Sequence, residues 1–148
     1  MKKFNQAMKD ALHFIGRLLA ILWQLPQTLV GIAAAVSTRA KFGHLYGVRF
    51  WQTDRFRGAV TLGEVIIVGS VGMDGLMLTV RHEYGHVRQS RILGPLYLPT
   101  VGLWSGVRAW LNLYRRGRYY DTWTERWADR LGGVTRDADG NRTYVPEP

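Results

Sequence analysis

Two histidines one helical turn apart, with a glutamate beside the first, are the residues of this sequence best suited to chemistry. They occur in the stretch VRHEYGHVRQ as His82, Glu83 and His86. Residues i and i+4 share one face of a helix, so both imidazoles can bind a single zinc ion. Glu83 lies beside that face, where it can take a proton from a metal-bound water. The stretch therefore predicts a zinc site with Glu83 as general base, and the alternative is a helix with two incidental histidines.

A second stretch offers the carboxylate ligand that the histidine pair lacks. In DTWTERWADRLGG, Glu125 and Asp129 are four residues apart and share a helix face. Two carboxylates so placed repel each other by about 0.2–0.5 kcal/mol unless a cation lies nearby. We expect Glu125 to be the third zinc ligand and Asp129 to accept the second ring N–H of His82 or His86.

Both carboxylates also have simpler interpretations. Thr122-x-x-Glu125 has the spacing of a capping box, in which the glutamate would bond back to the first amide of the helix. Asp129 has arginines nearby with which it can pair. His44 is the alternative third ligand if Glu125 is only a cap.

The composition restricts the partners and the chemistry. The chain has 148 residues, 47% of them hydrophobic, which suits one globular domain. It has no cysteine, so thiolate metal sites, disulfides and cysteine nucleophiles are excluded. The net charge of +9 comes mainly from 16 arginines and favours anionic partners. No nucleic-acid-binding motif accompanies the charge, so we expect no specific nucleic acid, and an anionic lipid surface explains the charge equally well.

Residues 1–38 form a basic, amphipathic and apolar N-terminal segment. Within it, residues 18–38 carry no charge over a length that can cross a bilayer. Pro26 removes a backbone hydrogen bond there and would kink or divide a helix. Two interpretations stay open: the segment associates with a membrane, or it is a broken pair of helices covering the remaining domain, residues 39–148. The chain would accordingly be membrane-associated or cytoplasmic.

The rest of the chain predicts an α+β fold. The β-branched and aromatic runs at 46–53, 58–63 and 64–70 indicate two or three strands of one small sheet. We expect this sheet to pack on a helix bearing the histidines, at about 75–93. Asp74 would cap that helix, and Gly94-Pro95 would end it.

Two further helices and a hairpin are predicted beyond the histidine helix. An apolar loop or crossover at 95–103 should lead into a helix at about 103–114. On that helix Trp104, Val107, Leu111 and Tyr114 form a stripe with ordinary core spacing. The glutamate-bearing helix should cover about 122–131, and a hairpin should turn around Asp139-Gly140.

Arginines recur along one side of the histidine helix. Arg81, Arg88 and Arg91, with Tyr84 among them, should form a basic stripe on the face away from the metal. Such a stripe is either solvated or, beside a membrane, in contact with lipid phosphates.

The motif His82-Glu83-x-x-His86 followed by Glu125-x-x-Ala128-Asp129 resembles the gluzincin pattern of zinc metallopeptidases, especially the minimal and membrane-linked gluzincins. The resemblance covers about residues 75–132. It implies a zinc endopeptidase acting on peptide or protein substrates, with a small sheet whose edge strand lines the substrate cleft. The stretch GEVIIVGS is the expected edge strand. Tyr119, Tyr120 and His44 are candidates for stabilising the oxyanion.

The sequence therefore favours a zinc-dependent metallopeptidase that uses a zinc-activated water, with Glu83 as general base. Two alternatives remain at this stage. One is a non-catalytic zinc-binding module, and the other is a basic protein of the membrane surface whose histidine motif is accidental.

Overall fold

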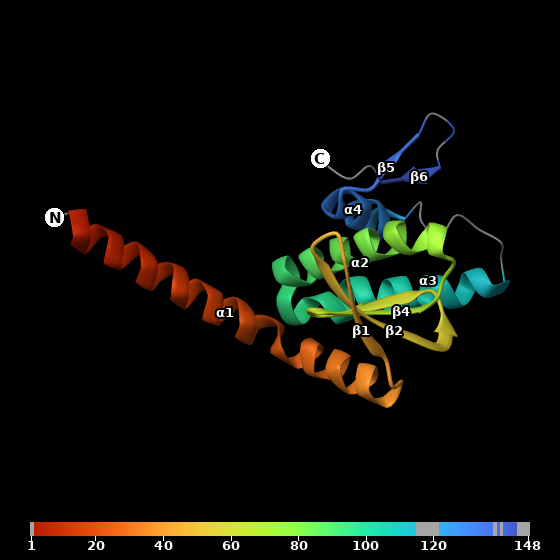
Figure 1. Ribbon diagram of the computed structural model, residues 1–148, viewed down its shortest axis with the longest axis horizontal. Helices are drawn as coiled ribbons and strands as arrows, with labels where there is room; N and C mark the ends of the chain where they lie inside the picture. Colours follow the sequence, from red (N-terminus) through yellow and green to blue (C-terminus); the bar gives the residue numbers. More distant parts are fainter. Residues whose placement is uncertain (1, 115–121, 138, 140, 145–148) are drawn as a thin grey trace.

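The computed structural model describes residues 2–114, 122–137, 139 and 141–144 and has the predicted α+β fold. A small sheet lies between helices, and a long N-terminal helix extends away from it (Figure 1). The main helices are α1 (Lys2–Ser37), α2 (Met73–Leu93), α3 (Leu103–Tyr114) and α4 (Trp123–Gly132). The four sheet strands are β1 (Lys41–Leu45), β2 (Val48–Arg57), β3 (Ala59–Leu62) and β4 (Val65–Ser70).

The sheet has the strand order β1-β2-β4-β3. β1 and β2 form an antiparallel hairpin around Tyr46 and Gly47, both of which have positive φ, as the favoured two-residue hairpin turn requires. β2 and β4 run parallel, and β3 returns antiparallel to β4. β1 was not predicted from the sequence, because its residues Lys41–Leu45 alternate only weakly between exposed and half-buried.

The predicted edge strand is wrong, and a different strand takes its place. β4 carries the expected GEVIIVGS stretch but lies inside the sheet, between β2 and β3. Its residues Ile66, Ile67 and Val68 are buried on both faces, and such an apolar run is typical of an interior strand. β3 is the edge strand on this side of the sheet.

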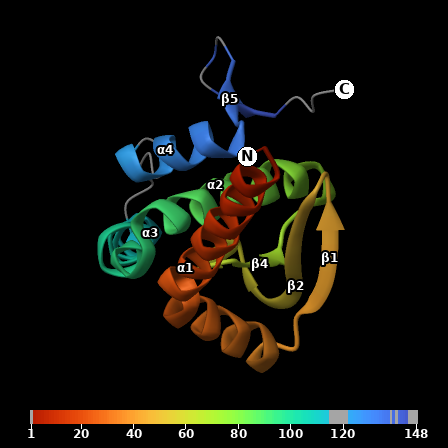
Figure 2. The same cartoon turned by 90° about the vertical axis from the view of Figure 1, so that its left-hand side faces the viewer.

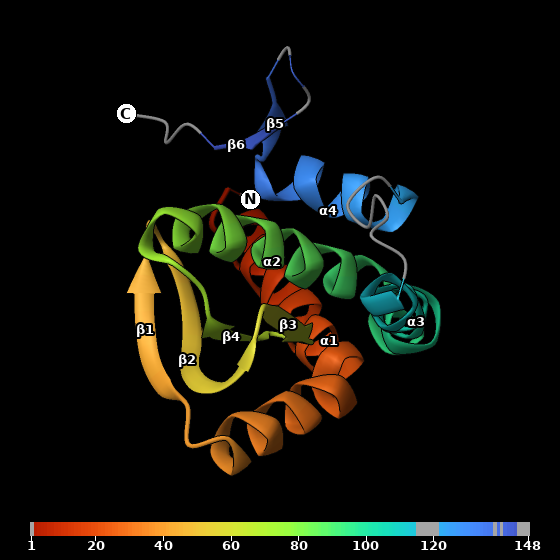
Figure 3. The same cartoon turned by 90° about the vertical axis from the view of Figure 1, so that its right-hand side faces the viewer.

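Helices cover both faces of the sheet. On one face, Val48, Phe50, Ile66 and Val68 pack against Val80 and Val87 of α2. On the other face, Val65 and Ile67 pack against Ala35 of α1. Figure 3 shows the sheet between α2 and the C-terminal part of α1. The second half of α1 is therefore part of the core of the domain.

α1 is one long helix that changes direction along its length. Pro26 lies inside it, and the ribbon bends where its colour passes from red to orange (Figure 1). The stretch Met8–Ser37 is long and apolar enough to cross a membrane, with a mean hydropathy of 1.6 over its most apolar window. Figure 1 shows the first half projecting from the rest of the molecule, and in Figure 2 this half points toward the viewer.

The histidine helix begins earlier than predicted. Its N-cap is Gly72, so Asp74 lies within the first turn and is not the capping residue. After Gly94, the chain does not form the expected loop. It continues through a 3-10 turn (Gly94–Leu96) and a π-helical turn (Leu98–Gly102) directly into α3.

The apolar stripe of α3 is not part of the core, contrary to the prediction from its spacing. Trp104, Val107 and Leu111 are between 41% and 45% exposed. The side chain of Tyr114, the fourth member of the stripe, lies outside the described residues. Helical spacing showed which residues share a face but could not show whether another element covers it.

The chain ends, within the described residues, in a hairpin. β5 (Thr135–Arg136) and β6 (Arg142–Thr143) pair antiparallel, and Asp137 accepts hydrogen bonds from the backbone N–H groups of Asp139 and Asn141 between them. The hairpin follows α4 directly, because Gly133 ends α4 in the left-handed conformation.

Candidate metal centre

α2 and α4 approach each other closely because glycines lie at their contact. A Cβ on Gly85 of α2 would overlap with the carbonyl oxygen of Ala128 on α4. A Cβ on Gly132 of α4 would likewise overlap with the carbonyl oxygen of Arg81 on α2. Glycine inside a helix costs about 1 kcal/mol relative to alanine, and here it allows two helix backbones to touch. This contact brings the carboxylates of α4 within reach of the histidines of α2.

Gly85→Ala is expected to weaken metal binding by about 10- to 100-fold, since overpacking of about 1–3 kcal/mol must push α4 away from α2. Gly75→Ala is the matched control. Gly75 lies in the same helix, but a Cβ there meets no atom within 4 Å, so this variant should be neutral or slightly more stable. Metal titration of both folded variants measures the difference. Equal metal affinity would show that the close helix contact does not position the site.

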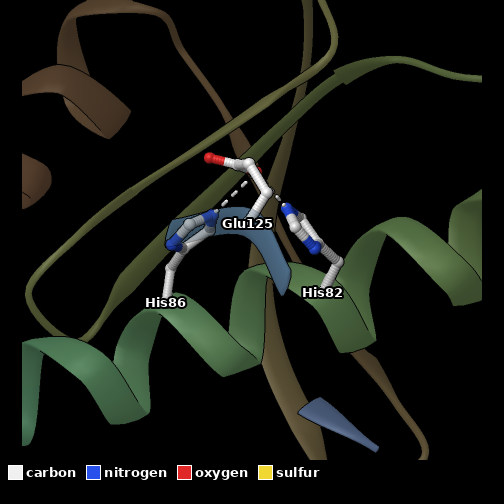
Figure 4. A group of neighbouring side chains, drawn as sticks. All are labelled: His82, His86 and Glu125. Atoms are coloured by element: carbon white, nitrogen blue, oxygen red, sulfur yellow. Dashed lines mark hydrogen bonds and ion pairs between the residues drawn. The ribbon is translucent and has the colours of Figure 1, made fainter. Parts of the chain in front are cut away.

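Three side chains converge from the two helices. His82 and His86 lie on α2 and Glu125 on α4, all three of them buried (Figure 4). The Oε2 atom of Glu125 lies 3.0 Å from Nε2 of His82 and 3.5 Å from Nε2 of His86. Ligand atoms of a tetrahedral zinc at about 2.0–2.1 Å lie about 3.3 Å apart. All three ligand atoms lie within 4.8 Å of one another. The group could therefore hold a metal ion.

The other ring nitrogens are already occupied. Nδ1 of His82 donates to Oδ1 of Asp129 at 2.7 Å, which is the hydrogen bond predicted from the sequence. Nδ1 of His86 donates to Oε1 of Gln89 at 2.7 Å, and Gln89 in turn donates to the carbonyl of Thr124. Each of these bonds fixes the ring and leaves Nε2 as the ligand atom, as in histidines that bind metals.

Asp129 is held by a residue that sequence reasoning missed. Arg142, on β6, donates to both carboxylate oxygens of Asp129, with its closest contact at 2.7 Å. The hairpin therefore supports the carboxylate that orients His82. No local spacing signals this contact, because it depends on how the chain folds back after α4.

Glu83 lies beside the three converging side chains but is not one of them. Its Oε2 accepts a 2.6 Å hydrogen bond from the hydroxyl of Thr61, on the edge strand β3. A cavity of about 450 Å³ is lined by Thr61, Glu83 and both histidines. The carboxylate is thus oriented at the cavity wall, beside the metal-binding group. Thr61 was also missed, since nothing in the sequence relates it to a glutamate 22 residues away.

The charges of the site balance without a metal. Burial alone would lower the pKa of His82, but its hydrogen bonds to Asp129 and Glu125 outweigh this and raise the pKa to about 9. Burial would raise the pKa of Glu125, yet hydrogen bonds from His82 and His86 hold it well below its usual value. The pKa of Asp129 is lowered in the same way by His82 and Arg142, against the opposing effect of its burial. In the metal-free protein, His82 is therefore a cation between two carboxylates.

Metal affinity should consequently rise with pH. Below pH 9 a metal must displace the Nε2 proton of His82, so affinity is expected to increase about tenfold per unit between pH 6.5 and 8. Titrations in buffers of different ionisation enthalpy should show at least one proton released per metal. Asp129→Asn removes one of the two carboxylates and should flatten this dependence. A pH-independent affinity in the unsubstituted protein would contradict the expected charge of His82.

The remaining predicted residues lie elsewhere. Tyr119 and Tyr120 lie outside the described residues. His44 is on β1, at the opposite edge of the sheet from β3, so it is not the alternative ligand. Thr122 is the N-cap of α4 but makes no side-chain cap hydrogen bond, and Glu125 faces the histidines instead of completing a capping box.

The arginines of α2 do not form one free stripe. Arg81 donates to the carbonyl of Gly132, and Arg88 donates to that of Leu131, so both bind the C-terminal end of α4. Arg91 pairs with Glu64 at 2.7 Å. These contacts tie α2 to its neighbours.

The fold and the site together define a class: a small α+β protein with a His-His-Glu group that could bind a metal at the contact of two helices. No family model matches the chain, and neither a curated protein nor a solved structure matches it.

Proposed function

We propose that the protein is a zinc-dependent metallopeptidase of gluzincin type, with His82, His86 and Glu125 as the zinc ligands and Glu83 as the general base. The observation that carries this proposal is the position of Glu83. A site used only for folding needs four protein ligands and no neighbouring free carboxylate. Here, within the described residues, three ligand atoms converge, and a fourth side chain, the carboxylate of Glu83, lies beside them at a cavity wall.

The proposed ligands also suit zinc better than other common metals. Two imidazoles and one carboxylate form a ligand set typical of catalytic zinc, whereas magnesium and calcium prefer oxygen ligands alone. Bound zinc would supply a water of lowered pKa and a Lewis acid for the substrate carbonyl. Asp129 and Gln89 would keep both histidines in the tautomer that offers Nε2.

Glu83 would accept the proton of the attacking water and deliver it to the leaving nitrogen. Thr61 donates a hydrogen bond to its Oε2, which holds the carboxylate in the cavity and leaves Oε1 for the proton. The same residue places the edge strand β3 beside the site. A substrate peptide would extend the sheet at β3, where the described part of the chain supplies no further strand, and so lie across the cavity.

Metal analysis and a peptide library test the proposal together. Purified protein is expected to contain one zinc per chain and to cleave internal bonds of some library peptides, with activity lost on chelation and restored by zinc. Stoichiometric zinc without cleavage of any peptide would favour the non-catalytic zinc-binding module. If the folded protein does not bind added zinc, both the metallopeptidase and the non-catalytic zinc-binding module are excluded. The histidine motif would then be accidental.

A further inference from the structure

The second half of α1 has the reverse of the polarity expected for a helix packed on a soluble domain. Its buried face carries Gln24, Gln27, Gly31 and Ala35, and the two glutamines are only 3% and 1% exposed. Its large apolar side chains are on the outside instead. They are Leu22, Leu25, Leu29, Val30, Ile32 and Val36, which are between 39% and 68% exposed.

Hydrogen bonds and close packing fix this orientation. Gln27 donates to Ser90 of α2, and Ser90 donates to Gln24. A Cβ on Gly31 would lie 2.7 Å from the backbone of Leu62, so only glycine allows α1 to approach the sheet this closely. Small residues and buried polar pairs at the helix contact, with large apolar residues outside, are typical of helices that pack within a membrane.

α3 shows the same polarity at a second place in the chain. Its sequence has one charged residue, Arg108, in twelve. Gly102 and Gly106 line the cavity of the metal centre. The large apolar residues of α3 whose side chains are described are all exposed: Leu103, Trp104, Val107, Trp110 and Leu111.

The two helices lie on the same side of the molecule. Trp23 of α1 lies against Gly94, at the turn that leads towards α3. Figures 2 and 3 show α3 on the opposite side of the molecule from β1, and Figure 1 shows the first half of α1 extending away from α3, so that only the second half of α1 lies near it. The exposed apolar residues of α1 and α3 therefore form a surface, called here the α1–α3 surface.

We propose that the α1–α3 surface contacts the hydrocarbon interior of a lipid bilayer, and that the substrates of the metal centre are membrane-anchored peptides. Large exposed apolar patches mark sites of contact with a membrane or another protein. In α1 alone, a stretch of 30 residues is long and apolar enough to cross a bilayer. The net charge of +9, with Arg17 and Arg39 at the two ends of the uncharged residues 18–38, complements anionic lipid headgroups.

The substrate class follows from the position of α3 and rests on the proposed peptidase function. The exposed apolar residues of α3 belong to the lipid-contacting surface, while Gly106 of α3 and Gly102, which directly precedes the helix, line the cavity that contains Glu83 and both histidines. The cavity is thus one helix away from the bilayer. A peptide segment held at the membrane can reach it without leaving the lipid surface.

Single-cysteine labelling tests the surface without any assay of activity, because the chain has no cysteine of its own. Fluorophores on Val36→Cys and Val107→Cys should be quenched strongly by nitroxide-labelled acyl chains in vesicles of phosphatidylcholine and phosphatidylglycerol. The control is Arg130→Cys, an exposed position on α4, where quenching should be weak. Equal quenching at the three positions would overturn the proposal. If the protein is dimeric and the fluorophores on the α1–α3 surface are not quenched by the labelled lipid, the surface binds a second copy of the chain. That result would also overturn the proposal.

A pair of peptides tests the substrate class. The same sequence is presented either free or anchored to the vesicles by an acyl chain, and the anchored form should be cleaved at least about tenfold faster. Leu111→Glu should lose this preference while keeping zinc and cleavage of the free peptide, and Arg130→Glu should keep it. Equal rates on both peptides would overturn the membrane-anchored substrate. Cleavage of neither peptide by zinc-loaded protein would overturn the peptidase function, and the quenching experiment would then decide the surface alone.

Discussion

Glu83→Gln is expected to abolish peptide hydrolysis while leaving zinc content and fold unchanged. Glutamine has nearly the same size and can still accept a hydrogen bond from Thr61 through its amide oxygen. It cannot accept a proton. General-base assistance contributes about 10²- to 10⁴-fold to the rate, and Glu83 would also return the proton to the leaving nitrogen, so the loss should lie toward the upper end.

The comparison requires zinc analysis of both proteins and rates on one peptide that the unsubstituted protein cleaves. Thr61→Val is a useful companion, because it removes only the hydroxyl that orients the carboxylate. It should lower the rate much less than Glu83→Gln and leave zinc in place. If Glu83→Gln cleaves as fast as the unsubstituted protein, Glu83 has no part in the mechanism.

Glu125→Gln is expected to reduce zinc affinity by more than the roughly 10- to 100-fold that loss of an outer hydrogen-bond partner costs. The substitution removes the charge of the proposed ligand but preserves the size of a side chain that is fully buried. It should leave α4 intact, because Glu125 does not complete a capping box and the N-cap of α4 makes no side-chain cap hydrogen bond that the substitution could remove. Competition of each variant with a chromophoric chelator measures the affinity.

Asp129→Asn is the matched control for this experiment, since it changes a buried carboxylate on the same helix that contacts His82 but is not a proposed ligand. Its zinc affinity should fall less than that of Glu125→Gln. Unchanged affinity in Glu125→Gln, with α4 still helical by circular dichroism, would mean that Glu125 is not a ligand.

Sequence reasoning was most successful where local spacing determines geometry. The i and i+4 positions of His82 and His86 on a helix follow from helical periodicity alone. The paired Glu125 and Asp129 could be assigned to the same site because two carboxylates on one helix face need a cation, and the structure places both against His82. Gly85 indicated close packing, and the structure shows the backbone of Ala128 against it.

Contacts between distant segments could not be predicted in this way. Thr61 and Arg142 each fix one group of the site through contacts that arise only after the strands and the hairpin have folded back. Gln89 differs from them, because it lies three residues after His86 on the same helix and its contact is local. The exposure of Trp104 and the interior position of β4 also depend on which neighbours a segment acquires. Periodicity shows which residues share a face but does not show what covers it.

Because His82 is a cation in the metal-free protein, the domain does not need a metal ion in order to fold. In small zinc domains whose like-charged or unpaired ligands meet only around the ion, removing the metal unfolds the chain. Here a proton on His82 occupies the place between Glu125 and Asp129. Because the pKa of His82 is raised to about 9, this stabilisation is complete below about pH 6.5, declines as the pH rises from there, and is lost once the pH has passed 9. We therefore expect the chain to stay folded without a metal at neutral pH, so that a chelator would remove a bound ion without unfolding the protein.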